Sequence, residues 1–274
     1  MSIQSEVAEQ IELARNEAWA NIHAAAPLGL ASELGLQSVR LGSALALVVA
    51  RLNHPMLNHV LGLGITQAAA EETVDAVCQL YQGVGITAYE VILSPNASPP
   101  DLTKWLEARG LQRRGEGAKL YRRTEPPPLI PTDLRVEEIG VEHAADFAAV
   151  FVEAFQLPKA LLKWAQTLVG RPNWHHFLAF DGERAVACGS LFLRSRIGWL
   201  GNDGTVPSHR QRGAQGAIIA ERIRAGARVR CEWLTSETGL DTPERPNHSY
   251  CNMVRNGFSL AYSPLVLQSK VSVG

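Results

Sequence analysis

The chain has 274 residues, of which 46% are hydrophobic and 19% charged, and its formal net charge at pH 7 is −1. This balance suits one or two globular domains and argues against a nucleic-acid-binding protein, which normally carries a basic surplus. The N-terminus lacks a basic start followed by an apolar run, and no apolar segment reaches membrane-spanning length. We therefore expect a cytoplasmic protein that contacts neither nucleic acid nor membrane.

Cysteine and histidine spacing gives no sign of a metal site. The cysteines lack a Cys-x-x-Cys pair and stand in apolar settings at Cys78, Cys188, Cys231 and Cys251. Adjacent histidines, such as those at 175 and 176, point to opposite faces of a strand and do not easily bind one ion together. We expect four buried free thiols in a reducing compartment and no metal.

The first half of the chain alternates helix and strand patterns. Its periodicity predicts, in chain order, a helix at 6–25, strands at 43–52 and 57–63, a helix at 68–82, a strand at 89–93, a helix at 101–109 and a strand at 118–122. Gly62 and Gly64 form a lone Gly-x-Gly pair, for which a tight turn is a better explanation than a nucleotide site.

A proline-rich stretch separates the two halves. Four prolines fall between residues 126 and 131. Such a run opposes both helix and central strand, because proline lacks the backbone N–H and has a fixed φ. We therefore predict a semi-rigid extended linker at 126–133.

The second half is richer in strands. Its patterns predict a strand at 134–139, helices at 141–155 and 158–169, strands at 174–181, 186–197 and 199–206, a helix at 213–227, a strand at 231–236, a helix at 247–255 and a strand opened by Phe258. The turn 181–184 joins the first two of its central strands into a hairpin.

The turn before the helix at 213–227 has the features of an anion site. The run 204–217 reads as a strand end, a basic turn and the first turn of a helix, where free N–H groups and the helix dipole favour an anion. Arg210 and Arg212 suit phosphate. Six arginines face one glutamate between residues 207 and 230, a surplus that a solvated helix face would also explain.

This run resembles the acyl-CoA pyrophosphate loop of GNAT-type N-acyltransferases, Arg/Gln-x-x-Gly-x-Gly/Ala. Arg210 and Gly213 match it, whereas Gln215 stands in the last slot. The elements around the loop also follow the family's order, and the closing pairs Gly110-Leu111 and Gly257-Phe258 lie 147 residues apart. The resemblance implies an α/β (α+β) fold of two tandem GNAT-like domains, each a mixed, mostly antiparallel sheet flanked by helices. A degenerate copy would span 1–125, and the acyl-CoA-binding domain 134–274.

The resemblance further implies an N-acyltransferase, most simply an N-acetyltransferase, which moves an acyl group from acetyl-CoA to a small-molecule amine. The pyrophosphate contacts would be Arg210, Gln211, Arg212, Gly213, Ala214, Gln215 and Gly216. Thr205 and Val206 would pair with the pantetheine arm like an added strand. Asn247 and Ser249 are candidate contacts to the same arm, and helix capping explains them equally well.

The candidate acid and base are less well marked. Many GNAT enzymes have a tyrosine four residues before the Gly-Phe pair, where Met253 stands here, so Tyr250 is the candidate acid unless it is a packed aromatic. Asp203 is the candidate base, acting through water, although it would equally cap a strand bulge. Glu237 is a second candidate, and bulk water a third.

Other readings stay open at this point. A non-catalytic acyl-CoA-binding or sensor protein would use the same loop, and the missing tyrosine favours it. A P-loop or dinucleotide-binding protein is disfavoured, since the loop follows an antiparallel meander and no Gly-x-x-x-x-Gly-Lys-Ser/Thr occurs. The acceptor would lie beside the helices within 141–169. Protein substrates, aminoglycosides and amino acids all remain candidates, Trp164 and Trp174 would line the site or the core, and a homodimer is not excluded.

Overall fold

The computed structural model describes residues 5–269, and its internal contacts divide the chain into two compact units. Unit 1 comprises the chain up to Ala24, Leu28–Gly117 and the chain from Tyr262, whereas unit 2 comprises Ala25–Pro27 and Ala118–Ala261. The boundary between the units falls inside one long strand, β5 (Gln112–Arg123), which runs from unit 1 into unit 2. Unit 1 also includes the chain from Tyr262, which lies within the predicted second domain. The division into a degenerate GNAT-like domain at 1–125, a linker at 126–133 and an acyl-CoA-binding domain at 134–274 stays a prediction.

Unit 1 is a mixed sheet with helices. It contains α1 (Ser5–Ala24), α2 (Leu28–Leu34), β1 (Leu36–Leu41), β2 (Ala44–Val49), β3 (His59–Leu61), α3 (Glu71–Gly83), β4 (Glu90–Leu93), α4 (Leu102–Ala108), the first half of β5 and β12 (Leu265–Gln268). The strand order is β1-β2-β3-β4-β12-β5; of these neighbouring pairs β3 and β4 are parallel and the others antiparallel. Sequence patterns predicted these elements except α2, β1, β12 and the first half of β5, since the predicted strand covers 118–122.

Unit 2 holds the larger set of strands. It contains the second half of β5, β6 (Arg135–Ile139), η1 (Val141–His143), α5 (Ala144–Ala154), η2 (Lys159–Leu161), α6 (Leu162–Gln166), β7 (Trp174–Asp181), β8 (Arg184–Arg194), β9 (Ile197–Thr205), η3 (Pro207–His209), α7 (Ala214–Arg228), β10 (Trp233–Gly239), α8 (His248–Arg255) and most of β11 (Ser259–Tyr262). Its strand order is β5-β10-β9-β8-β7-β6, with β9 and β10 parallel and β6 to β9 an antiparallel meander. All these elements match predicted ones within a few residues.

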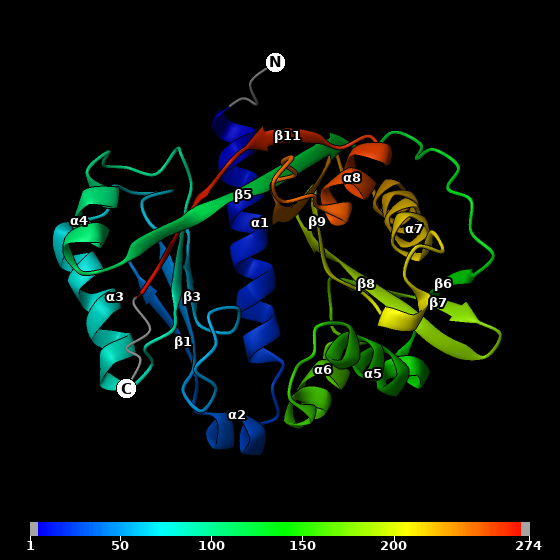
Figure 1. Ribbon diagram of the computed structural model, residues 1–274, viewed down its shortest axis with the longest axis horizontal. Helices are drawn as coiled ribbons and strands as arrows, with labels where there is room; N and C mark the ends of the chain where they lie inside the picture. The colour runs from blue at the N-terminus through cyan, green and yellow to red at the C-terminus, as the bar shows by residue number, and fades with distance from the viewer. Residues whose placement is uncertain (1–4, 270–274) are drawn as a thin grey trace. The chain divides into compact units, whose positions relative to one another are not determined.

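The centre of this sheet is covered on both faces. The middle of β8 is a continuous buried run, as expected for a strand with helices on both sides. α7 packs on one face, where its Ile218 lies beside Gly189 of β8, and α5 packs on the other, where its Phe147 contacts His176 of β7 (Figure 1). The two helix layers therefore enclose β8 and β9 and position the site described below.

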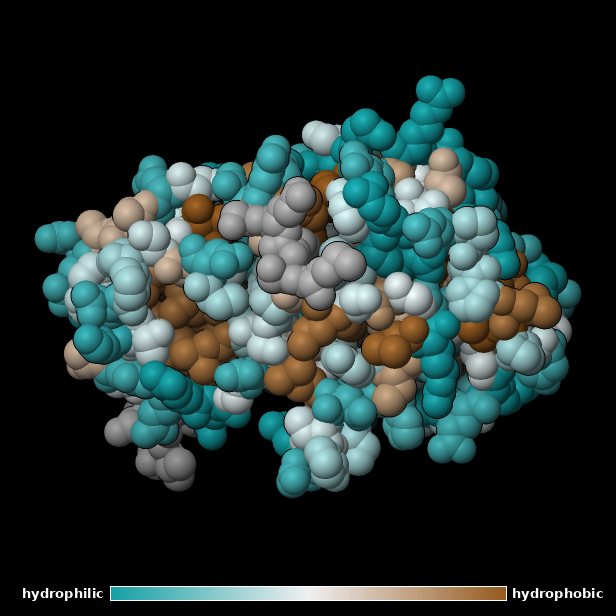
Figure 2. Space-filling view, turned by 90° about the horizontal axis from the view of Figure 1, so that it is seen from above, coloured by the Kyte–Doolittle hydropathy of each residue, from teal (hydrophilic) through white to brown (hydrophobic). Residues whose placement is uncertain are grey.

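One face of the molecule is mostly polar, as expected when most apolar residues are buried in the cores (Figure 2). Figure 2 shows the apolar residues of this face in small separate groups. All four cysteines are free thiols; Cys188 and Cys231 are buried, as predicted, whereas Cys78 and Cys251 are only half-buried. No helix within residues 5–269 combines the length and the apolar character needed to cross a lipid bilayer.

Candidate functional site

The two central parallel strands of unit 2 are paired only over their first parts. The register between β9 and β10 joins Ile197–Leu200 to Trp233–Ser236. Beyond that point β9 continues to Thr205 and β10 to Gly239. The last part of β9 therefore has a strand edge that can pair with an extended ligand.

A bulge stands in this last part of β9. Asn202 and Asp203 together lie opposite Gly189 of β8, because the register between the two strands shifts there. Asn202 has a left-handed φ of 57°, which asparagine tolerates better than most residues. The bulge re-aims the side chain of Asp203 toward α7.

Beyond the bulge, backbone alternation identifies one N–H that faces the open edge. The N–H of Val206 donates to the carbonyl of Val186 at 2.9 Å, so Val206 belongs to the β8 side of the strand. Because hydrogen-bonding directions alternate along an antiparallel pair, the N–H of Thr205 points away from β8. Of the two residues predicted to pair with an extended ligand, Thr205 is the one whose N–H is free to do so.

The loop that follows turns sharply into α7. Gln211 and Gly213 both have positive φ, 67° and 80°, and Gly213 immediately precedes the helix. The first-turn N–H groups of an α-helix have no intrahelical partners, and the helix dipole makes this end positive. The predicted turn and helix start are therefore present, and anion binding there stays a prediction.

The proline-rich segment lies across this helix start, and we call residues 130–133 the strap. Thr132 Oγ1 donates to the carbonyl of Arg212 at 2.8 Å. A Cβ at Gly213 would overlap the carbonyl oxygen of Pro131, and one at Gly216 would lie 3.0 Å from Ile130. The strap therefore requires glycine at 213, independently of any ligand, and packs tightly against Gly216.

A cavity of about 1080 Å³ opens beside the loop, a size that suits a large ligand. It is lined by Pro131, Thr132, Asp133, Ala154, Phe155, Asp203, Gly204, Thr205, His209, Arg210, Gln211, Arg212, Gly213, Ala214, Gln215, His248, Asn252 and Arg255. The structure thus brings together eight of the predicted site residues, Asp203, Thr205 and 210–215. Elsewhere in residues 5–269 lie Val206, Gly216, Asn247, Ser249 and Tyr250, which do not line this cavity.

The arginines of the cavity differ in their partners. Arg212 binds Asp181 at 2.6 Å and also Asp133 of the strap, and its guanidinium lowers the pKa of both carboxyls. Arg210 donates to the carbonyl of Thr205 at 3.4 Å, and Arg255 to the side-chain oxygen of Asn252 at 3.3 Å. Across residues 5–269 neither of these two has a carboxylate partner, so they are the cations available to an anionic ligand.

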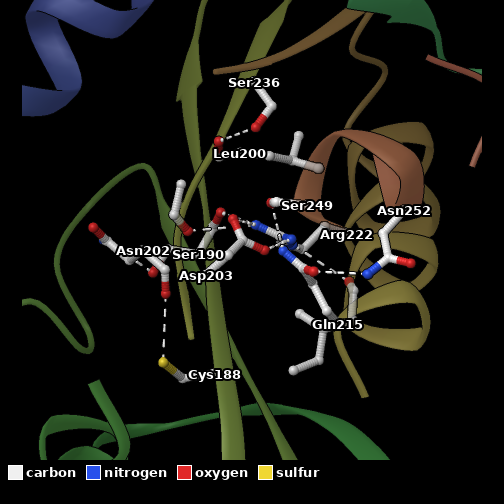
Figure 3. Close-up of polar contacts among 12 residues, drawn as sticks. Cys188, Ser190, Leu200, Asn202, Asp203, Gln215, Arg222, Ser236, Ser249 and Asn252 are labelled. Carbon is white, nitrogen blue, oxygen red and sulfur yellow. Dashed lines mark hydrogen bonds and ion pairs between the residues drawn. The ribbon is translucent and has the colours of Figure 1, made fainter. Parts of the chain in front are cut away.

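Gln215, in the slot where the GNAT pattern has glycine or alanine, ties α7 to α8. Its Nε2 donates to Ser249 Oγ at 2.8 Å, and its Oε1 accepts from Asn252 Nδ2 at 2.8 Å (Figure 3). Asn247 caps α8 by accepting the N–H of Tyr250 at 3.0 Å. The capping role considered for Asn247 is therefore observed, and the hydroxyl of Ser249 serves the contact between the helices.

One face of α8 completes the cavity and was not predicted. His248, Asn252 and Arg255 follow the i, i+4, i+7 spacing of a helical stripe. That spacing is visible in the sequence once the helix is placed at 247–255. The stripe is polar, however, and a polar stripe normally indicates solvent.

Both carboxylates that the sequence offered as bases are held in ion pairs. The two oxygens of Asp203 accept from Arg222 of α7, whose side chain is 0% exposed, against 13% for Asp203. Burial raises the pKa of the Asp203 carboxyl. Glu237 accepts from the fully buried Lys119 at 2.6 Å. The ion pair with Arg222 therefore holds Asp203 within the bulge of β9, which matches the capping role considered for it.

An apolar wall closes the cavity on the side of α5. A Cβ at Gly204 would lie 2.6 Å from the Cβ of Ala154 and 3.4 Å from the ring of Phe155. Phe155 is 37% exposed. Trp164 and Trp174, by contrast, are buried, so the core role considered for them is the one observed.

Comparison with known proteins rests on solved structures, since no family model and no curated protein matches the chain. A GCN5-related N-acetyltransferase from Kribbella flavida has a TM-score of 0.65 at 12% identity, over 99% of this chain and 97% of that one. Another from Sphaerobacter thermophilus has a TM-score of 0.59 at 15% identity, over 83% and 76%. A tandem GNAT protein from the clavulanic acid biosynthesis pathway gives 0.58 at 13% identity, over 85% and 81%.

These likenesses concern the fold. The chain has the fold of the GNAT N-acetyltransferases, with a mixed, mostly antiparallel sheet flanked by helices, as the sequence predicted. The similarity to the Kribbella flavida protein extends over both units.

Proposed function

We propose that the protein is an acyl-CoA-dependent N-acyltransferase, most simply an N-acetyltransferase, which binds its acyl-CoA in unit 2. The observation that carries this proposal is the cavity that joins three features. These are the start of α7, two arginines without carboxylate partners, Arg210 and Arg255, and the open edge of β9. Together they match a ligand that is an anion at one end and an extended amide chain at the other.

Each part of acyl-CoA has a counterpart in this arrangement. The pyrophosphate would bind the first-turn N–H groups of α7, with Arg210 and Arg255 as charge-assisted donors. The pantetheine arm would pair with β9 beyond Leu200 in the manner of an added strand. The thioester carbonyl would then lie near the N–H of Thr205, which suits the oxygen that becomes negative during acyl transfer.

The reaction needs little covalent chemistry from the protein. The nitrogen of a neutral amine attacks the thioester carbon, a C–N bond forms, and the C–S bond breaks. The amine loses one proton, and the departing thiolate gains one. Holding both reactants in line supplies several kcal/mol, and a preorganised N–H adds to it.

Neither side chain predicted to transfer a proton is placed to do so directly. Asp203 is bound by Arg222, and Tyr250 does not line the cavity within residues 5–269. Loss of the amine proton to bulk water is the route that this geometry favours. Asp203 as base through water and Tyr250 as acid stay predictions that substitution can test.

A second function is favoured by one specific observation. Met253, which is buried, stands where many GNAT enzymes have the tyrosine that protonates the thiolate. A protein that binds acyl-CoA without transferring the acyl group would lose nothing by this replacement. For the enzyme, we propose a small-molecule amine as acceptor, bound against the wall formed by Ala154 and Phe155.

Two measurements test the proposal. Acetyl-CoA binding by calorimetry is expected at micromolar Kd for the wild type. A screen of small amines should then reveal acceptor-dependent release of free CoA. Binding without CoA release for any amine would support the non-catalytic function, and no binding by the folded protein would contradict both.

A further inference from the structure

Arg222 is a fully buried cation in the middle of α7, and it faces the bulge of β9. Its Nη1 donates to Asp203 Oδ2 at 2.9 Å, to the carbonyl of Ser190 at 3.0 Å and to that of Gly201 at 3.4 Å. Its Nη2 donates to the other oxygen of Asp203. Figure 3 shows the guanidinium and the Asp203 carboxylate pointing toward one another between α7 and the sheet. One side chain therefore contacts β8 and both ends of the bulge.

The strand opposite the bulge leaves room for this guanidinium. A Cβ at Gly189 would lie 3.1 Å from Cζ of Arg222 and 3.2 Å from its Nη1. Glycine is unfavourable in the middle of a buried strand, where it packs little and costs conformational entropy. Its place here is explained by the close approach of α7, because the same Cβ would also lie 2.7 Å from Cγ2 of Ile218.

The other face of the bulge is held by a directed hydrogen-bond chain. Burial lowers the pKa of His176 to about 4, so the ring is neutral at pH 7. Its Nε2–H then donates to the carbonyl of Leu168 at 2.8 Å, and its Nδ1 accepts from Ser190 Oγ at 2.9 Å. The Ser190 oxygen in turn accepts from Asn202 Nδ2 at 3.2 Å. Asn202 and Asp203 are thus fixed from opposite faces of the sheet.

A buried ion pair is often no more stabilising than apolar side chains of similar size. Taking two charges out of water costs several kcal/mol per ion, and apolar residues of similar size often give equal or greater stability. Arg222 and Asp203 are therefore better explained by the backbone conformation that they impose than by stability. That conformation lies two residues before Thr205, whose N–H faces the open edge of β9.

We propose that Arg222 and Asp203 are positioning residues, which together fix the β9 bulge and thereby aim the N–H of Thr205 at the thioester carbonyl. This role rests on the proposed acyl transfer. It assigns Asp203 to the bulge, where it acts through the backbone, and leaves no proton-transfer role for it. The pyrophosphate site at the start of α7 is a separate region, about 12 Å along the helix from Arg222.

The test is a double-mutant cycle with Arg222→Met, Asp203→Leu and the two combined. Each single variant leaves one buried charge without its partner, so each is expected to unfold at lower temperature than the wild type. The double variant removes both charges and should regain most of that loss. We expect kcat to fall at least 10-fold in all three, with no additional loss in the double, while the Kd for acetyl-CoA stays within about 3-fold.

Two kinetic outcomes would overturn the proposal. Recovery of kcat together with thermal stability in the double variant would mean that the pair has a structural role only. A loss in Asp203→Leu that is far larger than in Arg222→Met, together with removal of one limb of the pH profile, would mean that Asp203 is a base. Arg222→Lys, which keeps the charge, provides a folded variant if Arg222→Met does not fold.

A spectroscopic measurement keeps the proposal testable if the proposed function fails. The backbone chemical shifts of Asn202 report its left-handed φ in the free protein, with or without acyl-CoA binding. We expect these shifts to leave left-handed values in the double variant. Unchanged shifts would overturn the proposal, whereas a wild type without CoA release would contradict the proposed function alone.

Discussion

The two units carry corresponding connections, β9 to α7 in unit 2 and β3 to α3 in unit 1, and the one in unit 2 borders a large cavity. In unit 1 the space beside the glycine turn is filled by protein. The N–H of Ser98 donates to the carbonyl of Gly64 at 2.8 Å, and a Cβ at Gly64 would lie 2.8 Å from the side chain of Leu102. In unit 2 the turn at Gly213 lines the cavity. A glycine turn before a helix is therefore not sufficient for an anion site.

The charges at the starts of α3 and α7 also favour an anion in unit 2 and disfavour one in unit 1. The first turn of α3 contains Glu71 and Glu72, which compensate the helix dipole and repel an anion. The first turn of α7 has no acidic residue, and Arg210 precedes it. At the unit 2 connection a cavity and an uncompensated helix start occur together, whereas at the unit 1 connection protein atoms lie against the turn and two glutamates follow it. If the predicted degenerate copy is correct, these differences are its physical meaning.

The largest expected effect is the loss of acyl-CoA binding when the available cations of unit 2 are removed. We expect Arg210→Ala combined with Arg255→Ala to weaken acetyl-CoA binding by about 100-fold or more, since each charge-assisted contact contributes roughly 1.5–3 kcal/mol. Calorimetry measures this. Arg40→Ala, an exposed arginine of unit 1, is the matched control and should bind like the wild type. An unchanged Kd in the double variant would contradict the proposal that Arg210 and Arg255 of unit 2 bind acyl-CoA.

A smaller effect concerns stability in acid, because each unit has a buried histidine whose pKa is lowered, His23 in unit 1 and His176 in unit 2. Burial lowers the pKa of His176 in unit 2 to about 4 and that of His23 in unit 1 to about 3. The unfolded chain therefore takes up these protons near pH 6.5, whereas the folded chain does not. The unfolding free energy should fall by about 2 kcal/mol for each histidine between pH 7 and pH 5.

Urea unfolding at pH 7, 6 and 5 measures this slope. His176→Gln should reduce the slope whatever it does to stability at pH 7, and it leaves the contribution of His23 in place. An equal slope in His176→Gln and in the wild type would show that His176 is protonated in the folded state as well.

Alanine substitutions in the two glycine turns, at Gly64 and at Gly213, should lower stability alike but differ in their effect on acetyl-CoA binding. Alanine at Gly64 or at Gly213 would need a positive φ, which costs about 1–2 kcal/mol for a residue with a side chain, and would also meet protein atoms. We expect both variants to lose stability in urea. Only Gly213→Ala should weaken acetyl-CoA binding, and weaker binding in Gly64→Ala would place a site in unit 1.

The smallest expected effect concerns the strap. Asp133→Asn removes one of the two carboxylates on Arg212 and leaves Asp181. Exposed ion pairs are weak and screened by salt, so we expect acetyl-CoA to bind about 2- to 3-fold more tightly at low salt and equally at 0.5 M salt. Weaker binding would mean that Asp133 organises the site instead of competing for Arg212.

Local patterns predicted the scaffold of the site well. The run 204–217 contains its own strand end, turn and helix start, so it could be recognised without knowledge of distant residues. Asn247 likewise marks a helix start by its type. The edge strand β1 was missed because its burial alternates imperfectly, and β12 because its partners, β4 and β5, lie far away in the chain.

The contacts that decide the chemistry depend on distant partners and could not be predicted. Arg222 counted toward a basic surplus typical of a solvated face, yet it is buried because Asp203, 19 residues earlier, is turned toward it by the bulge. Arg212 looked like a phosphate ligand, and its carboxylate partners come from the strap and from β7. Pairing between distant charges is a property of the fold, which periodicity does not reveal.

The most direct measurement of the central claim is a crystal structure of the wild-type protein with acetyl-CoA. We predict one molecule per chain, with its pyrophosphate at the first turn of α7 beside Arg210 and Arg255 and its pantetheine along β9. A molecule bound at the β3–α3 connection of unit 1, or none in a crystal grown from millimolar acetyl-CoA, would contradict the account.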